Sequence, residues 1–446
     1  MSGHSDRYGS HSAPGTIGLG RTASTIAGII CAVFTVLILI WILFNAHPTA
    51  GEVTVELPSV NMSQSVTDFF TSGKEDIFKN ALSDEKTKSS GKTASTSAEK
   101  PAYEPERDIN PYAVLSDRTK IHWSSIIICC AAVSGFALAS ALYVSRNARR
   151  STIWFVFVIT AFLTIVFGRM LFYAFFPNTY PNLTSALFNP SRGSWCIIAI
   201  LPALLIASML AEALGFDTSS GRILDCMAPG AALFLALLQT AAMYNNTLRG
   251  NVPTGIEVLK RLPFSDTVSR GGEYFYTAFF PRFLLLMLAT FFLLWFFFNR
   301  RKKRMKGDTT RNGHVSCMFI ALYAATELLT DSVRTDRYLI NPNGFLSLSQ
   351  LVSIVAMAGV LLYYTILSAR QNGKCGYHNV LWIAFVLCAA AIFICDALLS
   401  GEAEKVMFLY AVKAAALFIM LLVIYLCYTT CCGVIAANAK GGSHFG

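Results

Sequence analysis

The sequence predicts an all-α protein that crosses a membrane many times, and three observations favour this class. The chain has 446 residues, of which 54% are hydrophobic and only 14% are charged. The hydrophobic residues gather in about ten blocks of roughly 18–25 residues, each long enough to cross roughly 30 Å of hydrocarbon as a helix. The sequence lacks the short alternating segments of a transmembrane barrel, so the backbone polar groups must be satisfied within helices.

The first predicted span follows a polar tail, residues 1–25. Residues 26–44 form a block that is longer than a signal-peptide core and has no convincing small-residue cleavage site, so we expect a retained signal anchor. Residues 45–121 are rich in Ser, Thr, Lys and Glu, which indicates a disordered linker. The remaining spans are predicted at 122–144, 152–176, 195–214, 226–244, 278–298, 315–333, 347–368, 379–400 and 406–430.

The basic residues predict the orientation of these spans. The net charge is +10, and the densest basic run begins at Arg300, directly after a span. By the positive-inside rule, the loops with most basic residues lie in the cytoplasm with both termini. The linker then lies outside, together with the loops 177–194, 245–277 and 334–346. We expect contact with anionic lipid and no binding of nucleic acid, because no nucleic-acid-binding fold accompanies the basic run.

The span 315–333 contains the densest set of polar residues. Tyr323, Glu327, Asp331 and Arg334 are spaced four, four and three residues apart, which places them on one stripe of a helix. A charged side chain in the middle of a bilayer costs about 2.5 kcal/mol or more, so the stripe must face protein or water. Two interpretations remain open. The stripe is either structural, with an Asp331–Arg334 pair and Glu327 bonded across the bundle, or one wall of a lipid headgroup site.

Other polar residues lie near the predicted outer ends of spans. Arg169 has the planar fork of donors that suits a phosphate, although it could instead pair with Asp331 or Glu327. Gln239 and Asn245 add uncharged donors at a similar depth.

Two further observations concern residues with a structural interpretation. Asp396 and Lys413 lie at depths that let them meet across the last hairpin, so we expect a structural ion pair. His122 lies alone at an outer span boundary, where a solvated side chain is more common than a catalytic base.

The cysteines lie mostly in or beside apolar blocks, and their spacing supports neither a zinc site nor a disulfide framework. We therefore expect no metal and no other cofactor.

Several strings then occur in a characteristic order: IHWSSIIICCAA, GRMLFY, RILDCMAPGAAL, GHVSCMFIALYAATELLTDSVRTD and GFLSLSQLVSIVAMAGVLL. From about residue 120 to 368, this order resembles the bacterial prolipoprotein diacylglyceryl transferase family. The resemblance implies a seven-helix transferase core at 122–368 in the bacterial inner membrane. Residues 369–446 would then contribute two further helices and a short tail.

The resemblance implies an outward-facing site that moves the diacylglyceryl group of phosphatidylglycerol onto the cysteine of a lipoprotein signal peptide. The implied partners are therefore phosphatidylglycerol, or another anionic phospholipid, and the signal peptide. The residues expected at the site are Tyr323 and Arg334 as catalytic groups, with Arg169, Gln239, Asn245, Asp331 and Gln350 at the headgroup.

The sequence departs from the family pattern at its most important charges. Gln239 replaces the signature arginine, and Glu327 replaces the arginine of the seventh-helix motif. Ala242 and Thr247 replace an asparagine and a glutamate, and the histidine expected near 193–196 is missing. In a dry site, each lost charge-assisted contact is worth about 2–4 kcal/mol.

Three hypotheses about function follow. The first is a divergent transferase in which Arg169, Arg334 and Arg249 bind phosphate, while Tyr323 or His122 assists proton transfer. The second is a catalytically inactive relative that binds lipid or lipoprotein. The third and weakest is a transporter, since Glu327 and Asp331 only partly supply an acidic coupling relay.

Overall fold

The computed structural model describes residues 112–116, 119–146, 149–175, 182–188, 196–217, 219–245, 248–253, 265–267, 274–305, 312–334, 346–372, 377–399 and 406–441. The predicted N-terminal tail, signal anchor and linker up to residue 111 lie outside the described residues.

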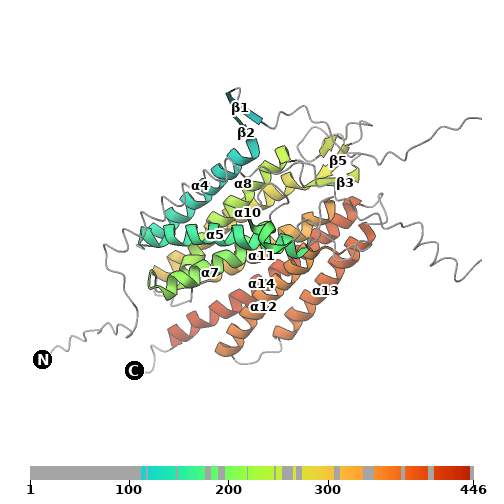
Figure 1. Cartoon of the computed structure of the whole chain (residues 1–446). Helices are drawn as coiled ribbons and strands as arrows, with labels where there is room; N and C mark the ends of the chain where they lie inside the picture. The colour runs from blue at the N-terminus through green and yellow to red at the C-terminus, as the bar shows by residue number, and fades with distance from the viewer. Residues whose placement is uncertain are drawn as a thin grey trace, which may run out of the picture.

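The described part of the chain is a bundle of helices with short strands at one end (Figure 1). The helices are α4 (Trp123–Val144), α5 (Arg150–Phe175), α6 (Leu183–Phe188), α7 (Ile200–Ala213), α8 (Ser220–Asn245), α10 (Phe279–Met305), α11 (His314–Thr330), α12 (Leu348–Asn372), α13 (Tyr377–Leu399) and α14 (Val406–Gly441), with 3₁₀ turns η2 (Ile197–Ala199) and η3 (Asp331–Val333).

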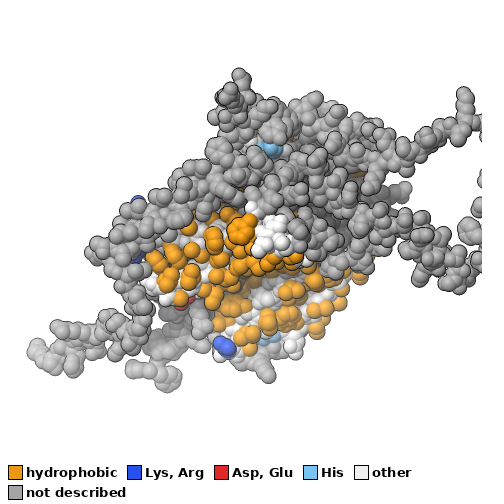
Figure 2. Space-filling model, in the orientation of Figure 1, with side chains coloured by type: hydrophobic (Ala, Val, Ile, Leu, Met, Phe, Trp, Pro, Cys, Tyr) orange, Lys and Arg blue, Asp and Glu red, His pale blue; other side chains and the backbone are white. Residues whose placement is uncertain are grey.

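Seven of the described helices, α4, α5, α8, α10, α12, α13 and α14, are long and apolar enough to cross a membrane. This confirms the predicted all-α, multi-pass class. Figure 2 shows hydrophobic side chains over most of the described surface on one face.

Two predicted spans are shorter in the structure than expected. The span 195–214 becomes η2 followed by the 14 residues of α7, which at about 1.5 Å per residue cannot cross the hydrocarbon alone.

The span predicted at 315–333 also changes at its end. Helix α11 has 17 residues and stops at Thr330, and the chain continues as the 3₁₀ turn η3. Arg334 then adopts an extended conformation, with φ −74° and ψ 142°. The predicted stripe is therefore helical only through Glu327, because Asp331 and Arg334 lie on the turn that ends the helix.

Helix α8 lies against α4, α7, α10 and α11. Its contact with α4 depends on two glycines, because a Cβ on Gly230 would come within 2.4 Å of the Gly135 carbonyl oxygen. Small residues at such a crossing let two helix backbones approach closely in a membrane.

An aspartate of α8 positions α11. The Asp225 carboxylate accepts hydrogen bonds from the backbone N–H groups of Gly313 at 2.8 Å, Val315 at 2.9 Å and Ser316 at 3.2 Å. The first N–H groups of a helix have no partner within the helix, so this carboxylate caps α11 from a neighbouring helix.

The strands lie where α4 and α10 begin and α8 ends, which we call the strand end of the bundle (Figure 1). β1 (Tyr112–Ser116) and β2 (Thr119–His122) form an antiparallel pair. β3 (Arg249–Pro253), β5 (Tyr274–Thr277) and β4 (Ser265–Thr267) form a sheet in that order. The hairpin β1–β2 corrects the end of the predicted linker, because backbone pairing orders the residues that lead into α4. The opposite end, which carries Arg146, Arg222 and Arg300, we call the basic end.

Candidate functional site

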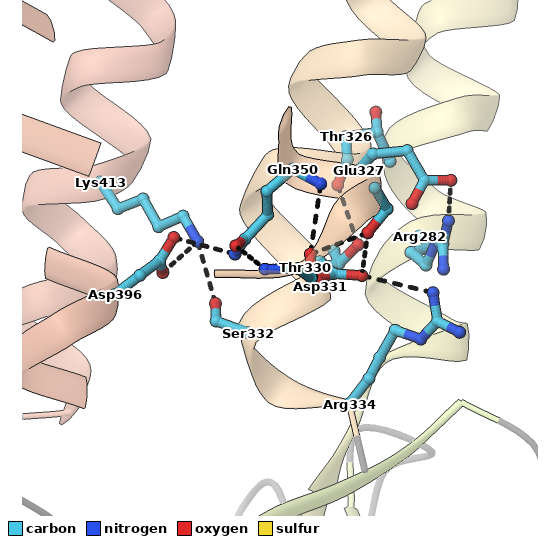
Figure 3. A network of polar contacts seen from close by, with 12 residues as sticks. Arg282, Thr326, Glu327, Thr330, Asp331, Ser332, Arg334, Gln350, Asp396 and Lys413 are labelled. Carbon is cyan, nitrogen blue, oxygen red and sulfur yellow. Dashed lines mark hydrogen bonds and ion pairs between the residues drawn. The ribbon is translucent and has the colours of Figure 1, made fainter. Parts of the chain in front are cut away.

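A group of polar side chains from six segments meets at the strand end (Figure 3). We call it the strand-end network. Its members are Arg282 of α10, Tyr323 and Glu327 of α11, Asp331, Ser332 and Arg334 of the η3 turn, Ser347, Ser349 and Gln350 at the start of α12, and Asp396 and Lys413 of α13 and α14.

Asp331 is the centre of this network and is fully buried. Its carboxylate accepts hydrogen bonds from the hydroxyl groups of Ser347 and Ser349, the latter at 2.7 Å. It also pairs with Arg334, whose Nη1 atom lies 3.4 Å away. These contacts join the end of α11 to the start of α12. The predicted Asp331–Arg334 pair is therefore present.

Arg334 is held by its backbone as well as by its side chain. It forms a β-bridge with Gly250 of β3. Gly250 is required there, because a Cβ would lie 1.6 Å from the Tyr276 carbonyl oxygen. The side chain of Arg334 is 12% exposed, whereas no other ionic partner in the network exceeds 5%. Arg334 is thus the most accessible charge of the network. Arg249 precedes Gly250 along β3, and its side chain lies outside the described residues.

Glu327 pairs with Arg282 across the contact between α10 and α11. Both side chains are buried, at 3% and 4% exposure. The Glu327 carboxylate is therefore neutralised by an arginine from another helix. The sequence analysis missed Arg282, although a signal was present: it is the single charged residue of the predicted span 278–298.

Tyr323 lies one turn before Glu327, is buried and is within electrostatic reach of the Glu327 carboxylate. The Cys196 thiol lies within electrostatic reach of both Tyr323 and Arg334. The Cys196 backbone N–H donates to the Gly168 carbonyl oxygen at 3.3 Å, so the part of α5 that carries Arg169 lies near the network. Arg169 itself is buried, at 2% exposure.

The predicted pair of Asp396 and Lys413 is also present, with 2.6 Å between Lys413 Nζ and Asp396 Oδ1. Its contacts extend beyond the hairpin. Gln350 Nε2 donates to the second Asp396 oxygen at 2.9 Å, and Lys413 Nζ donates to the Ser332 hydroxyl at 2.9 Å. The pair therefore connects the C-terminal hairpin to both α12 and η3.

Three of the remaining predicted residues have other surroundings. Gln239 donates to the Leu235 carbonyl oxygen of its own helix at 3.0 Å, and its buried Oε1 atom has no hydrogen-bond partner among the described residues. Asn245 is the last residue of α8, and its side chain is outside the described residues. His122 is buried rather than solvated, because it caps α4 and its Nδ1 atom lies 2.6 Å from the Ser124 hydroxyl.

The charges of the strand-end network balance, since it contains Arg282, Arg334 and Lys413 against Glu327, Asp331 and Asp396. A buried charge is tolerated when it is paired and hydrogen-bonded, as each of these is. Arg169, on the neighbouring helix α5, is buried as well. Arg334, the most exposed cation of the network, is the group through which an anion could bind here.

The fold and this network define a multi-pass helical membrane protein with a buried ionic cluster at one end of the bundle. The family model described as prolipoprotein diacylglyceryl transferase matches residues 111–366, more than half of the chain. The chain therefore belongs to the prolipoprotein diacylglyceryl transferase family, which confirms the resemblance seen in the sequence.

Two relatives support this assignment. Proteins named phosphatidylglycerol–prolipoprotein diacylglyceryl transferase from two strains of Clostridium kluyveri are each 24% identical to this chain over 267 residues. Each match covers 59% of this chain and 98% of the relative. The family match ends within α12, so the helices α13 and α14 lie beyond it.

Proposed function

We propose that this protein transfers the diacylglyceryl group of phosphatidylglycerol to the cysteine of a lipoprotein signal peptide. The observation that carries the proposal is the position of Arg334. It is the most exposed cation of a buried ionic network, and its backbone is fixed to β3 in a chain of this family. A guanidinium held in this way suits a lipid phosphate, because its donors match two phosphate oxygens.

In this reaction, the cysteine sulfur attacks the glyceryl carbon that carries the phosphate ester. A carbon–sulfur bond forms and the carbon–oxygen bond to the phosphate breaks. The thiol proton passes to a base, and glycerol phosphate leaves with the electrons of the broken bond. The enzyme must therefore accept one proton and stabilise the negative charge that develops on the leaving phosphate.

The residues predicted from the sequence can be assigned to these two tasks. Arg334 and Arg169 bind the phosphate, assisted by Arg249 of β3, while Gln239, Gln350, Asn245 and Asp331 shape the headgroup site. Tyr323 is the first candidate to relay the thiol proton, because it is buried within electrostatic reach of the Glu327 carboxylate. His122 is the second, because its imidazole lies 2.6 Å from a hydroxyl at the strand end. Pairing with Arg282 keeps Glu327 from opposing the bound phosphate with a free charge.

The proposed site faces the outside of the bacterial inner membrane, and both termini lie in the cytoplasm. The positive-inside rule supports this orientation, because Arg146, Arg222 and Arg300 lie at the opposite end of the bundle from the network.

The test is a transfer assay with the purified full-length chain in phosphatidylglycerol vesicles and a peptide that carries a lipobox cysteine. We expect the peptide to gain the mass of a diacylglyceryl group. Arg334→Ala should reduce the rate by about a hundredfold, because an interaction made in the transition state is lost. The matched control is Arg222→Ala, which removes an arginine at the basic end and should leave the rate unchanged.

The absence of a mass gain with the wild-type chain would contradict the transferase proposal. If the chain nevertheless retained phosphatidylglycerol through purification, and Arg169→Ala abolished that retention, the protein would be a lipid-binding relative without catalytic activity.

A further inference from the structure

The C-terminal hairpin, α13 and α14, contains an ion pair buried more deeply than a peripheral hairpin requires. Lys413 is fully buried and Asp396 is 2% exposed. Removing both charges from water costs several kcal/mol per ion, which the attraction between them does not reliably recover. A well-packed apolar pair would hold two helices together at least as well. The choice of a lysine and an aspartate therefore needs a reason beyond joining α13 to α14.

The first contact that explains the buried lysine joins Lys413 to η3. The Lys413 ammonium donates to the Ser332 hydroxyl at 2.9 Å, and the Tyr410 hydroxyl donates to the same oxygen at 3.1 Å. Ser332 lies between Asp331 and Arg334 on η3. Two side chains of α14 thus hold the turn that precedes the site arginine, and Figure 3 shows the contact made by Lys413.

A second route reaches the same turn from Asp396. Its Oδ2 atom accepts from Gln350 Nε2 at 2.9 Å, and Gln350 Oε1 accepts from the Ser347 backbone N–H at 3.1 Å. The Ser347 hydroxyl donates to Asp331, which pairs with Arg334. An unbroken series of hydrogen bonds therefore links the hairpin carboxylate to the Arg334 guanidinium. Because both routes converge on η3, the hairpin constrains this turn from two sides.

We propose that Lys413 and Asp396 are positioning residues, which fix η3 so that Arg334 presents its guanidinium to an anionic headgroup. Neither residue touches the headgroup itself. The proposal deepens the function proposed above and rests on it for its kinetic consequences, whereas the effect on Arg334 itself can be measured independently. It also assigns a role to two helices that lie beyond the family match at residues 111–366.

The decisive variant is the double substitution Lys413→Met with Asp396→Asn. It removes both charges at nearly constant volume, so no buried charge is left unpaired and folding should be preserved. The matched control is Arg300→Met. It removes another bond between a cation and a hydroxyl that joins α14 to the core, because Arg300 Nη1 donates to the Tyr428 hydroxyl at 2.7 Å at the basic end.

The first readout is the rate at which phenylglyoxal modifies Arg334 in the purified full-length chain, measured by peptide mass spectrometry. The double variant should raise this rate several-fold, and Arg300→Met should leave it unchanged. An unchanged rate in the double variant would overturn the positioning role, whether or not the protein is a transferase.

The second readout is kinetic and applies when the wild-type chain transfers lipid. The KM for phosphatidylglycerol should rise about tenfold in the double variant, because small displacements of a positioning group have large effects. The KM for the peptide should stay within about twofold of wild type. Equal changes in both KM values, or the same change in Arg300→Met, would indicate general structural damage and overturn the proposal. A wild-type chain that transfers no lipid would refute the proposed function alone, since the Arg334 modification rate still decides this inference.

Discussion

Both ends of the bundle contain charged and hydroxyl-bearing side chains, but these side chains make different kinds of contact at the two ends. At the basic end, Asp217 is bonded to the Tyr143 hydroxyl and lies 3.5 Å from Arg222, which is 25% exposed. The Asp225 carboxylate accepts hydrogen bonds from backbone N–H groups at the start of α11, which have no partner within the helix. At the strand end, buried side chains bond mainly to other side chains, and the ion pairs are at most 12% exposed.

This difference indicates which end is under functional constraint. The contacts at the basic end cap a helix and join partly solvated side chains, and contacts of these kinds occur in any helical bundle. The strand-end network also includes a helix cap, because Ser347 and Gln350 each accept the other's backbone N–H at the start of α12. Its ion pairs are not part of that cap, and buried ion pairs are weak evidence for stability. We infer that its charges are retained for the chemistry of the site. The variants below test this contrast, from the largest expected effect to the smallest.

Glu327→Ala should be the most damaging change, because it leaves the buried Arg282 guanidinium without its carboxylate. Removing one partner of a buried pair costs about 3–5 kcal/mol. Thermal unfolding of the purified protein in detergent should show a large drop in Tm. The charge-exchanged double variant, Arg282→Glu with Glu327→Arg, should recover most of the loss. A Glu327→Ala protein that unfolds at the wild-type temperature would show that the pair is dispensable.

Tyr323→Phe and Tyr143→Phe compare one hydroxyl at each end. Loss of the Tyr323 hydroxyl should lower kcat for diacylglyceryl transfer by about a hundredfold, the low end of what general acid–base catalysis contributes. Loss of the Tyr143 hydroxyl should lower only Tm, because the bond to Asp217 is structural. If Tyr323→Phe keeps full activity, the proton passes through another group, and His122→Ala becomes the next variant to measure.

Asp225→Ala removes the cap of α11 and should destabilise the protein by about 1–2 kcal/mol, the usual value of a lost N-cap. Chemical denaturation followed by circular dichroism measures the change. Asp225→Asn keeps one acceptor oxygen and should be milder. If the cap contributes only to folding, both variants should retain the wild-type KM for phosphatidylglycerol. A selective rise in that KM would instead extend the functional site toward the basic end.

Arg300→Met should have the smallest effect, because the bond between its partly exposed guanidinium and the Tyr428 hydroxyl is worth about 1 kcal/mol. The same denaturation experiment should detect a small shift, with the transfer rate unaltered. An effect as large as that of Glu327→Ala would remove the distinction between the two ends.

Part of the site was predictable because helical periodicity is a local property. The four-residue spacing from Tyr323 to Glu327 to Asp331 predicted a shared stripe, and all three side chains are buried. The spacing also suggested a continuous helix to residue 333, which was wrong. The chain turns at Asp331 because Ser347 and Ser349, from the next helix, bond to its carboxylate.

The partners of the buried charges were harder to predict. Arg282 lies 45 residues before Glu327, and the pairing follows from the contact of α10 with α11. The pair of Asp396 and Lys413 was foreseen because two adjacent spans of a hairpin must run side by side. Its bonds to Gln350 and Ser332 were not, because they depend on how the hairpin packs against the core.

The sequence alone determined that this chain is a multi-pass helical membrane protein of the prolipoprotein diacylglyceryl transferase family, because hydrophobic block length and motif order are properties of the linear chain. It also predicted that Gln239 and Glu327 stand where the family has arginines. Only the tertiary structure decided that Arg282 neutralises Glu327 and that the last two helices hold the turn of Arg334. The physical reason is that a buried charge is satisfied by whichever group packing brings within hydrogen-bonding distance, and packing joins residues that the sequence separates.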